Sequence, residues 1–144
     1  MTKPIRLSSR QSSLSSKTEG STYIIDKGWG REIIFADEPS YCGKLMQFDC
    51  KGSKFSMHYH AVKDETWYVS RGSFLLRIIN TNTANITERF LKTGDSWRNA
   101  PLVPHQLEAL EDNSEIIEVS TYDDADDNYR VIPGDSQTSL NNSS

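Results

Sequence analysis

Residues 52–72 read GSKFSMHYHAVKDETWYVSRG, and the spacing of polar residues in this stretch is the most informative feature of the sequence. His58 and His60 are two positions apart, so on a β-strand both side chains leave the same face. Residues 61–64 are long enough to turn the chain, which places Glu65, at the start of the next strand-like run, beside the two imidazoles. The third histidine of the sequence, His105, follows a proline-marked turn and begins another such run. All three histidines and one glutamate are therefore predicted to form a single site.

Three neutral imidazoles and one carboxylate are a ligand set that suits a divalent ion such as Mn, Fe, Co, Ni or Zn. We therefore predict one divalent metal ion, held by His58, His60, Glu65 and His105, and the sequence does not determine which metal it is. In an octahedral sphere such a set leaves positions open for water or substrate. Open positions are typical of a reactive metal, because a structural site is closed by protein ligands.

The middle of the chain is a series of short runs rich in β-branched and aromatic residues, separated by groups of Gly, Pro, Asn and Asp. No segment shows a sustained helical period of apolar residues. The sequence therefore predicts an all-β protein, with a double-sheet jelly-roll barrel as one of few ways to arrange so many short strands. The expected strands are 22–26, 31–36, 41–50, 65–71, 73–80, 86–92, 105–110 and 114–122.

Both ends of the chain are poor in residues that a core can bury. Residues 1–20 and 136–144 are rich in Ser and polar residues, so we expect two flexible tails around one folded domain at 21–135. The net charge of −4 comes from 16 basic and 20 acidic residues, and no basic cluster indicates nucleic-acid binding. No apolar stretch is long enough for a membrane helix, and no signal-peptide core is present.

Cys42 and Cys50 lie in one strand-like run, 41–50. Along a straight strand their α-carbons would be roughly 26 Å apart. A disulfide tolerates no more than about 7 Å, so the two thiols are not expected to pair with each other. Free thiols are typical of a reducing compartment, and we expect a cytoplasmic protein.

The stretch 52–72 resembles the first motif of the cupin superfamily throughout. The matching frame is Gly52, five residues, His58-x-His60, four residues, Glu65, six residues and Gly72. A second motif is matched in part by Gly94 and His105, but its proline is displaced to Pro101, its second glycine is replaced by Leu102, and Pro104 stands directly before His105. The resemblance covers about residues 28–130, and it implies a small single-domain cupin, a double-stranded β-helix barrel.

Within the cupins, the sequence resembles the cupin domain of type II mannose-6-phosphate isomerases. The residues that carry this similarity are Trp29-Gly30, Glu65-Thr66-Trp67, Ile117-Glu118-Val119 and Asp126-Asp127-Asn128-Tyr129-Arg130. The sequence departs from that family at His58, where the family usually carries glutamine, and it lacks the nucleotidyltransferase domain that those enzymes often have.

This resemblance implies a sugar or sugar-phosphate isomerase or epimerase, with a small-molecule substrate and no identified catalytic base. Lys63, Arg130 and Arg98 are candidate cations for a phosphate or hydroxyls, and Trp97 is a candidate for the mouth of the barrel. The alternative for each cation is a solvated charge on the barrel rim. Two other functions stay open: an iron- and oxygen-dependent cupin dioxygenase, and a non-catalytic metal- or sugar-binding barrel. The resemblance also implies a homodimer, and runs 22–26 and 31–36 are apolar enough to need covering.

Overall fold

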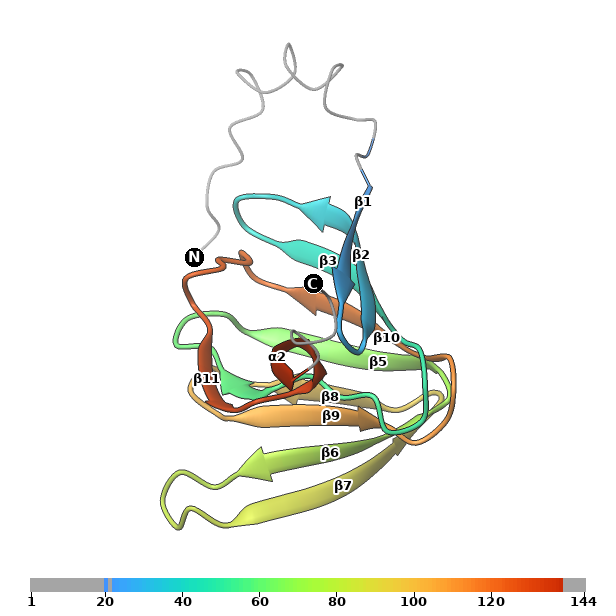
Figure 1. The fold of residues 1–144 in the computed structure, drawn as a ribbon. Coiled ribbons are helices and arrows are strands. Elements are labelled where there is room, and N and C mark those ends of the chain that lie inside the picture. Colours follow the sequence, from blue (N-terminus) through green and yellow to red (C-terminus); the bar gives the residue numbers. More distant parts are fainter. Residues whose placement is uncertain (1–19, 21, 139–144) are drawn as a thin grey trace.

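The computed structural model describes residue 20 and residues 22–138, which form two antiparallel β-sheets (Figure 1). One sheet has the strand order β1 (Tyr23–Lys27), β2 (Gly30–Asp37), β3 (Cys42–Phe48), β10 (Ser114–Ser120), β5 (Glu65–Arg71), β8 (Ser96–Asn99). The other has the order β11 (Tyr129–Ile132), β4 (Met57–Tyr59), β9 (His105–Ala109), β6 (Ser73–Ile79), β7 (Ile86–Lys92). A short helix, α2 (Asp135–Thr138), follows β11. The predicted all-β cupin barrel is confirmed.

The predicted runs missed three short strands, β4, β8 and β11. They have three or four residues each, MHY, SWRN and YRVI. A strand of this length is too short to display a clear alternation of inward and outward residues, so its pairing with a neighbour decides its conformation. Here β8 pairs with β5, and β11 pairs with β4.

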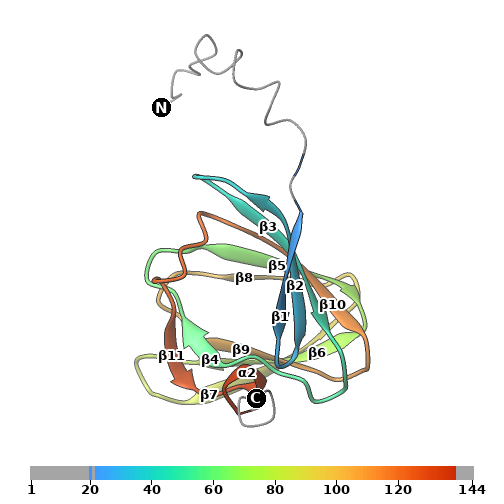
Figure 2. The same ribbon diagram turned by 45° about the horizontal axis from the view of Figure 1, so that its top comes forward.

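The two sheets are opposite walls of a barrel, and Figure 2 shows the C-terminal segment and α2 at one end of it, near the turn between β1 and β2. The inward face of the strands changes its chemistry along the barrel. On β10 the buried side chains are Ile116 and then Glu118, and on β9 they are His105 and then Leu107. One half of the interior is therefore apolar, and the other half carries polar and charged side chains.

The apolar half is a packed core to which both sheets contribute. Phe48 of one sheet meets Phe74 of the other edge to face, with 4.9 Å between ring centroids. Burial of these side chains is the main favourable contribution to folding. The cluster consists of Trp29, Met46, Phe48, Phe55, Trp67, Val69, Phe74, Leu76, Leu91, Leu107, Ala109 and Ile116.

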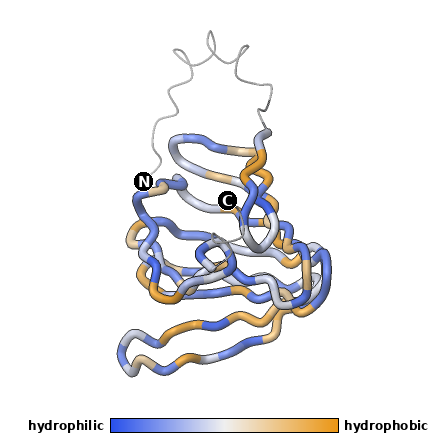
Figure 3. The backbone as a smooth tube through the Cα atoms, in the orientation of Figure 1, coloured by the Kyte–Doolittle hydropathy of each residue, from blue (hydrophilic) through white to orange (hydrophobic). Residues whose placement is uncertain are grey.

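Figure 3 shows apolar residues along the edge strand β1, near the N-terminal end of the fold. Ile24 and Ile25 on this strand are exposed. An exposed apolar edge is consistent with the expected homodimer, which stays a prediction. No helix in residues 22–138 is long and apolar enough to cross a bilayer. Cys42 and Cys50 are both free thiols, as expected.

The two tails expected at 1–20 and 136–144 lie almost entirely outside the described residues. Residues 136–138 are the main exception, because they belong to α2. The hydroxyl of Ser136 accepts a hydrogen bond from the main-chain N–H of Gly28 at 3.0 Å. The folded unit therefore continues at least to Thr138, beyond the boundary expected from composition.

A comparison of Gly72 with Gly52 distinguishes the backbone strain of a positive φ from the steric clash of an added Cβ. Both have positive φ, 74° and 91°. A Cβ on Gly72 would lie 2.8 Å from the Cβ of Ser114, whereas a Cβ on Gly52 would meet no atom within 4 Å. We expect Gly52→Ala to lower the free energy of unfolding by about 1 kcal/mol, from backbone strain alone, and Gly72→Ala to lower it by about 3 kcal/mol. Urea denaturation measures both, and equal losses would contradict the packing argument.

Candidate metal centre and its cavity

The three histidines are brought together by the pairing of β4 with β9. His58 lies in β4 directly opposite His105, the first residue of β9, and His60 follows the end of β4. In each ring Nδ1 lies close to a main-chain oxygen. His58 contacts that of Ser56 at 2.8 Å, His60 that of Asp127 at 2.6 Å, and His105 that of Val103 at 2.9 Å. A carbonyl oxygen only accepts, so Nδ1 carries the proton in all three rings, and Nε2 keeps a free lone pair.

The carboxylate of Glu65 lies among these free lone pairs. Its Oε1 is 2.8 Å from Nε2 of His105 and 3.7 Å from Nε2 of His60. Both partners in each contact are acceptors when Nδ1 is protonated, and Nε2 of His105 is buried without a hydrogen-bond partner among the described residues. One ligand atom from each histidine lies within 4.8 Å of the others. Acceptors that converge with no donor between them fit a cation, and main-chain carbonyls on Nδ1 are the usual outer partners of metal-bound histidines.

The charge states of these side chains also suit metal binding. Burial and the neighbouring rings of His105 and His60 lower the pKa of His58 well below its ordinary value, so this ring is neutral at neutral pH. Burial alone would raise the pKa of Glu65. The contact with Glu118 and the charge of Lys63 act against burial, and the pKa of Glu65 is held below its usual range. A neutral imidazole and an ionised carboxylate are the forms that bind metal.

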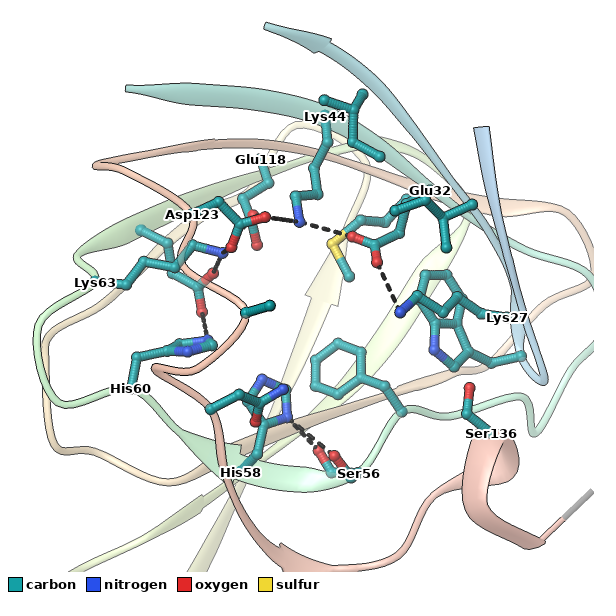
Figure 4. A pocket seen from close by; sticks show the side chains of 18 of the residues that line it. Lys27, Glu32, Lys44, Ser56, His58, His60, Lys63, Glu118, Asp123 and Ser136 are labelled. Carbon is teal, nitrogen blue, oxygen red and sulfur yellow. Dashed lines mark hydrogen bonds and ion pairs between the residues drawn. The ribbon is translucent and has the colours of Figure 1, made fainter. Parts of the chain in front are cut away.

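A network of ion pairs adjoins Glu65, and Figure 4 labels Lys63, Glu118, Asp123, Lys44 and Glu32, which form it. The ammonium of Lys63 is 3.4 Å from Glu65, 3.1 Å from Glu118 and 3.0 Å from Asp123. Lys44 continues the network, with contacts of 3.0 Å to Asp123 and 2.7 Å to Glu32. The side chains of Lys44 and Lys63 are only 8% and 4% exposed, so water contributes little to their solvation and the carboxylates must replace it.

The carboxylates keep both lysines charged. Burial alone would lower the pKa of Lys44 and of Lys63, but the facing acids, Glu118 first, outweigh it and raise both pKa values. Burial and repulsion by Glu65 raise the pKa of Glu118, although the two lysines act in the opposite direction. For Asp123 the lysines outweigh burial, and its pKa is lowered. We call Glu32, Lys44, Lys63, Glu118 and Asp123 the charged wall. It holds two ammonium groups, with an ionised Asp123 between them.

The metal-ligand cluster and this wall face one cavity of about 280 Å³. This volume is close to the lower end of those typical of small-molecule sites. Apolar side chains of Trp29, Met46 and Phe55 line the cavity as well, and the loop 123–128, Arg130, Ser136 and Gln137 line it at the C-terminal end. The cavity therefore combines one apolar surface with a charged one, an arrangement suited to a small polar ligand.

The structure separates the four side chains predicted to bind substrate. Lys63 and Arg130 line the cavity. Arg98 and Trp97 are not among its lining residues: Arg98 is exposed and paired with Asp64 at 2.7 Å, and the Trp97 indole packs against the core and donates to Asn99 at 3.0 Å. Both belong to β8, whose place in the sheet was not predicted.

Sequence reasoning missed four charged residues of the wall: Glu32, Lys44, Glu118 and Asp123. A signal for two of them is present in the alternation of their strands. Lys44 has the same parity as Met46 and Phe48 on β3, and Glu118 has the same parity as Ile116 on β10, so each falls on the inward face. A charge on the inward face of a strand needs a buried partner, and this parity was the available clue.

Asp127 fixes the loop that carries His60 and Lys63. Its carboxylate accepts hydrogen bonds from three consecutive main-chain N–H groups, those of residues 61–63, at 2.7, 3.0 and 2.9 Å. These N–H groups outweigh burial and lower the pKa of Asp127. Its own carbonyl oxygen accepts from Nδ1 of His60. One residue of the loop after β10 therefore both orients a metal-ligand candidate and fastens the loop that holds it.

The departure from the second cupin motif has a local consequence. Leu102, which stands where the motif has glycine, adopts a φ of 70°. The leucine thus takes the left-handed conformation that glycine adopts without strain. Its N–H donates to the main-chain oxygen of His60 at 2.7 Å, and its side chain is exposed. The turn before His105 keeps the shape that glycine favours, and His105 reaches the cluster.

Comparisons with known proteins support the fold. No protein-family model matches this sequence, nor does any curated protein. Among solved structures, KdgF from Halomonas sp. is 25% identical, with a TM-score of 0.58 over 67% of this chain and 81% of that one. The capsular polysaccharide assembling protein CapF from Staphylococcus aureus is 18% identical, with a TM-score of 0.68 over 82% of this chain and 34% of that one. Oxalate decarboxylase from Bacillus subtilis is 18% identical, with a TM-score of 0.65 over 79% and 30%.

These three proteins are cupin-fold proteins, and this chain shares their fold. It spans about a third of the CapF and oxalate decarboxylase chains. Together with the geometry above, the comparisons define a cupin-fold protein whose His58, His60 and His105 form a cluster able to bind a metal ion.

Metal content tests this cluster directly. We expect the untagged protein to bind about one divalent ion per chain, and a hundredfold excess of ion over Kd to add about 2.7 kcal/mol to the free energy of unfolding. The His58→Ala/His105→Ala double variant loses both effects, because two of the converging lone pairs are gone. Elemental mass spectrometry and thermal denaturation with and without a chelator measure them.

A Cys50→Ser variant is the control for this experiment, because Cys50 is an exposed free thiol and thiolates are metal ligands in general. Its metal content should equal that of the wild type. A wild type that takes up no ion after reconstitution, or a double variant that keeps its ion, would contradict the assignment.

Asp127 should tune metal affinity without touching the ion. We expect Asp127→Ala to weaken metal binding by about 10–100-fold, because the loop of residues 61–63 loses its three acceptor contacts. Asp126→Ala removes the adjacent, exposed carboxylate and should leave the affinity unchanged. Competition with a fluorescent chelator gives both constants, and similar values for the two variants would refute the positioning role.

Proposed function

We propose that this protein is a metal-dependent cupin enzyme that transfers a proton on a small, hydroxylated carbonyl compound, as a sugar or sugar-phosphate isomerase or epimerase. The observation that carries the proposal is the position of the charged wall. His58, His60 and Glu65 line the cavity, and His105 contacts Glu65 at 2.8 Å. Lys63 also lines the cavity and forms ion pairs with both Glu65 and Asp123. Metal ligands and proton-carrying groups thus face the same space.

A divalent ion held by these four side chains supplies Lewis acidity at a carbonyl oxygen. The protein must supply the rest of the chemistry. Moving a hydrogen between neighbouring carbons of an aldose or ketose needs a group that accepts the proton and returns it. Asp123 is the candidate for this role, because its side chain is 31% exposed while those of Glu32, Glu118 and Glu65 are 10%, 4% and 2% exposed.

Two lysines hold the carboxylate of Asp123 in place. Lys44 and Lys63 each lie 3.0 Å from one of its two oxygens. This double contact fixes the orientation of the carboxylate against the cavity. The carboxylate oxygens of the wall can also accept hydrogen bonds from hydroxyl groups, which favours a hydroxylated substrate over an apolar one.

The resemblance to type II mannose-6-phosphate isomerases supports the same reaction class. Of the residues that carry this resemblance, Glu118 and Arg130 line the cavity, and Asp127 holds the loop that carries His60. An iron- and oxygen-dependent reaction would use the same ligands, but it gives no role to paired ammonium and carboxylate groups in the wall. The reaction class is therefore inferred from the wall, and the metal site alone does not select it.

Exchange of substrate hydrogen with solvent tests the proposal without knowledge of the product. We expect the metal-loaded protein in D2O to incorporate deuterium at C1 or C2 of at least one sugar from a panel of aldoses, ketoses and their 6-phosphates, as seen by NMR. Asp123→Asn should slow this exchange by about 10²–10⁴-fold at unchanged metal content. Asp126→Asn, in the same loop, is the control and should exchange at the wild-type rate.

Two results would refute the proposal. The first is the absence of exchange and isomerisation for every sugar with every metal tested. The second is consumption of oxygen by the iron-loaded protein with a chelating substrate, which would assign it to the oxygenases.

A further inference from the structure

Arg130 differs from the other cations that line the cavity. Lys27, Lys44 and Lys63 each form an ion pair with a carboxylate, at 3.2, 2.7 and 3.0 Å for their shortest contacts. The guanidinium of Arg130 has no ion pair or hydrogen bond within residues 22–138, and the residue is exposed. In β11 Arg130 lies opposite His58, and directly opposed residues of antiparallel strands share a face, so its side chain lies on the cavity side.

Two side chains of the segment that follows add hydrogen-bond donors to the lining of the cavity. The hydroxyl oxygen of Ser136, labelled in Figure 4, accepts the N–H of Gly28, which leaves the O–H free to donate. The amide oxygen of Gln137 accepts the N–H of Gly134 at 2.8 Å, which leaves its NH₂ group free to donate. Both residues line the cavity. Each therefore offers a donor to a ligand, and one of its acceptor lone pairs is already used.

The negative groups of the cavity do not cancel this donor set. Glu32, Glu65, Glu118 and Asp123 are all in contact with the lysines of the wall. Asp124 also lines the cavity, but one of its oxygens accepts the N–H of Asp126 within its own loop. Asp124 keeps its negative charge, but Arg130 is the one cation of the cavity lining that forms no ion pair within residues 22–138.

We propose that Arg130, with Ser136 and Gln137, forms an anion subsite on the part of the cavity lining contributed by the C-terminal segment, next to the strand that carries His58, so that the substrate carries a carboxylate or phosphate group. This inference rests on the proposed function for its location relative to the reacting carbonyl, and it adds the substrate class: an acidic sugar or a sugar phosphate. A planar guanidinium with two neighbouring neutral donors matches either anion, because both present several acceptor oxygens to a fork of N–H groups.

Equilibrium binding to the metal-loaded protein tests the subsite. The probes are mannose, mannuronate and mannose 6-phosphate, which share one ring and differ in their charge, and isothermal titration calorimetry gives their affinities. We expect one of the two anions to bind about tenfold or more tightly than mannose, and this advantage to disappear in Arg130→Gln. Arg130→Lys should keep part of it, since the charge remains and the fork is lost. The anion that shows the advantage distinguishes a carboxylate subsite from a phosphate subsite.

Arg71→Gln is the matched control, because Arg71 is an exposed arginine at the far end of β5 from Glu65 and forms only a 3.6 Å surface pair with Glu115. It should bind all three probes as the wild type does, and metal content confirms that each variant is folded and loaded. Equal affinities for the three probes, no binding of either anion, or an anion advantage that survives in Arg130→Gln would overturn the subsite. Since binding is measured and not turnover, anion selectivity without hydrogen exchange would refute the proposed reaction and leave the subsite standing.

Discussion

The structure of the site depends on one constraint: three main-chain carbonyls accept hydrogen bonds from Nδ1–H of the three histidines. These bonds set the tautomer of every ring, and the Nε2 lone pairs of His60 and His105 then face the carboxylate of Glu65. Buried acceptors that face each other without a donor are costly, since no hydrogen bond replaces their lost hydration. A bound cation turns this cost into favourable coordination, so ion binding and the local fold around the barrel end are thermodynamically linked.

The same reasoning explains why the barrel has two unlike halves. Apolar side chains from both sheets fill one half, and a cooperative set of charges occupies the other. Ion pairs buried in this way contribute little net stability compared with apolar packing, but removal of one partner leaves an unpaired buried charge. The charged wall therefore does not exist for its contribution to the free energy of unfolding. Its value lies in the fixed positions of charged groups beside the metal ligands.

The sequence was sufficient for the barrel and for the metal cluster, because both are encoded in local patterns. Alternation identified most strands, and the spacing of His58, His60 and Glu65 implied a shared strand face and a turn. The wall was not accessible in this way. Lys44 and Glu118 are neighbours only because β3 pairs with β10 in a register that sets Glu118 opposite Lys44. A period of two shows which residues share a face, but it does not show which distant strands are adjacent. Arg98 and Trp97 illustrate the same limit, since the position of β8 decides where they point.

The segment after β10 connects the features of the site that were described separately. Its Asp123 completes the wall, Asp127 holds the loop of His60 and Lys63, and Arg130, Ser136 and Gln137 provide the donors of the proposed anion subsite. A ligand that binds this subsite therefore contacts the same short segment that orients a metal ligand. Any ordering of this segment by the ligand acts on the metal site, and by reciprocity an ion that orders His60 and its loop must favour the ligand to the same extent. Metal and substrate binding are thus expected to be coupled through residues 123–137, without movement of the sheets.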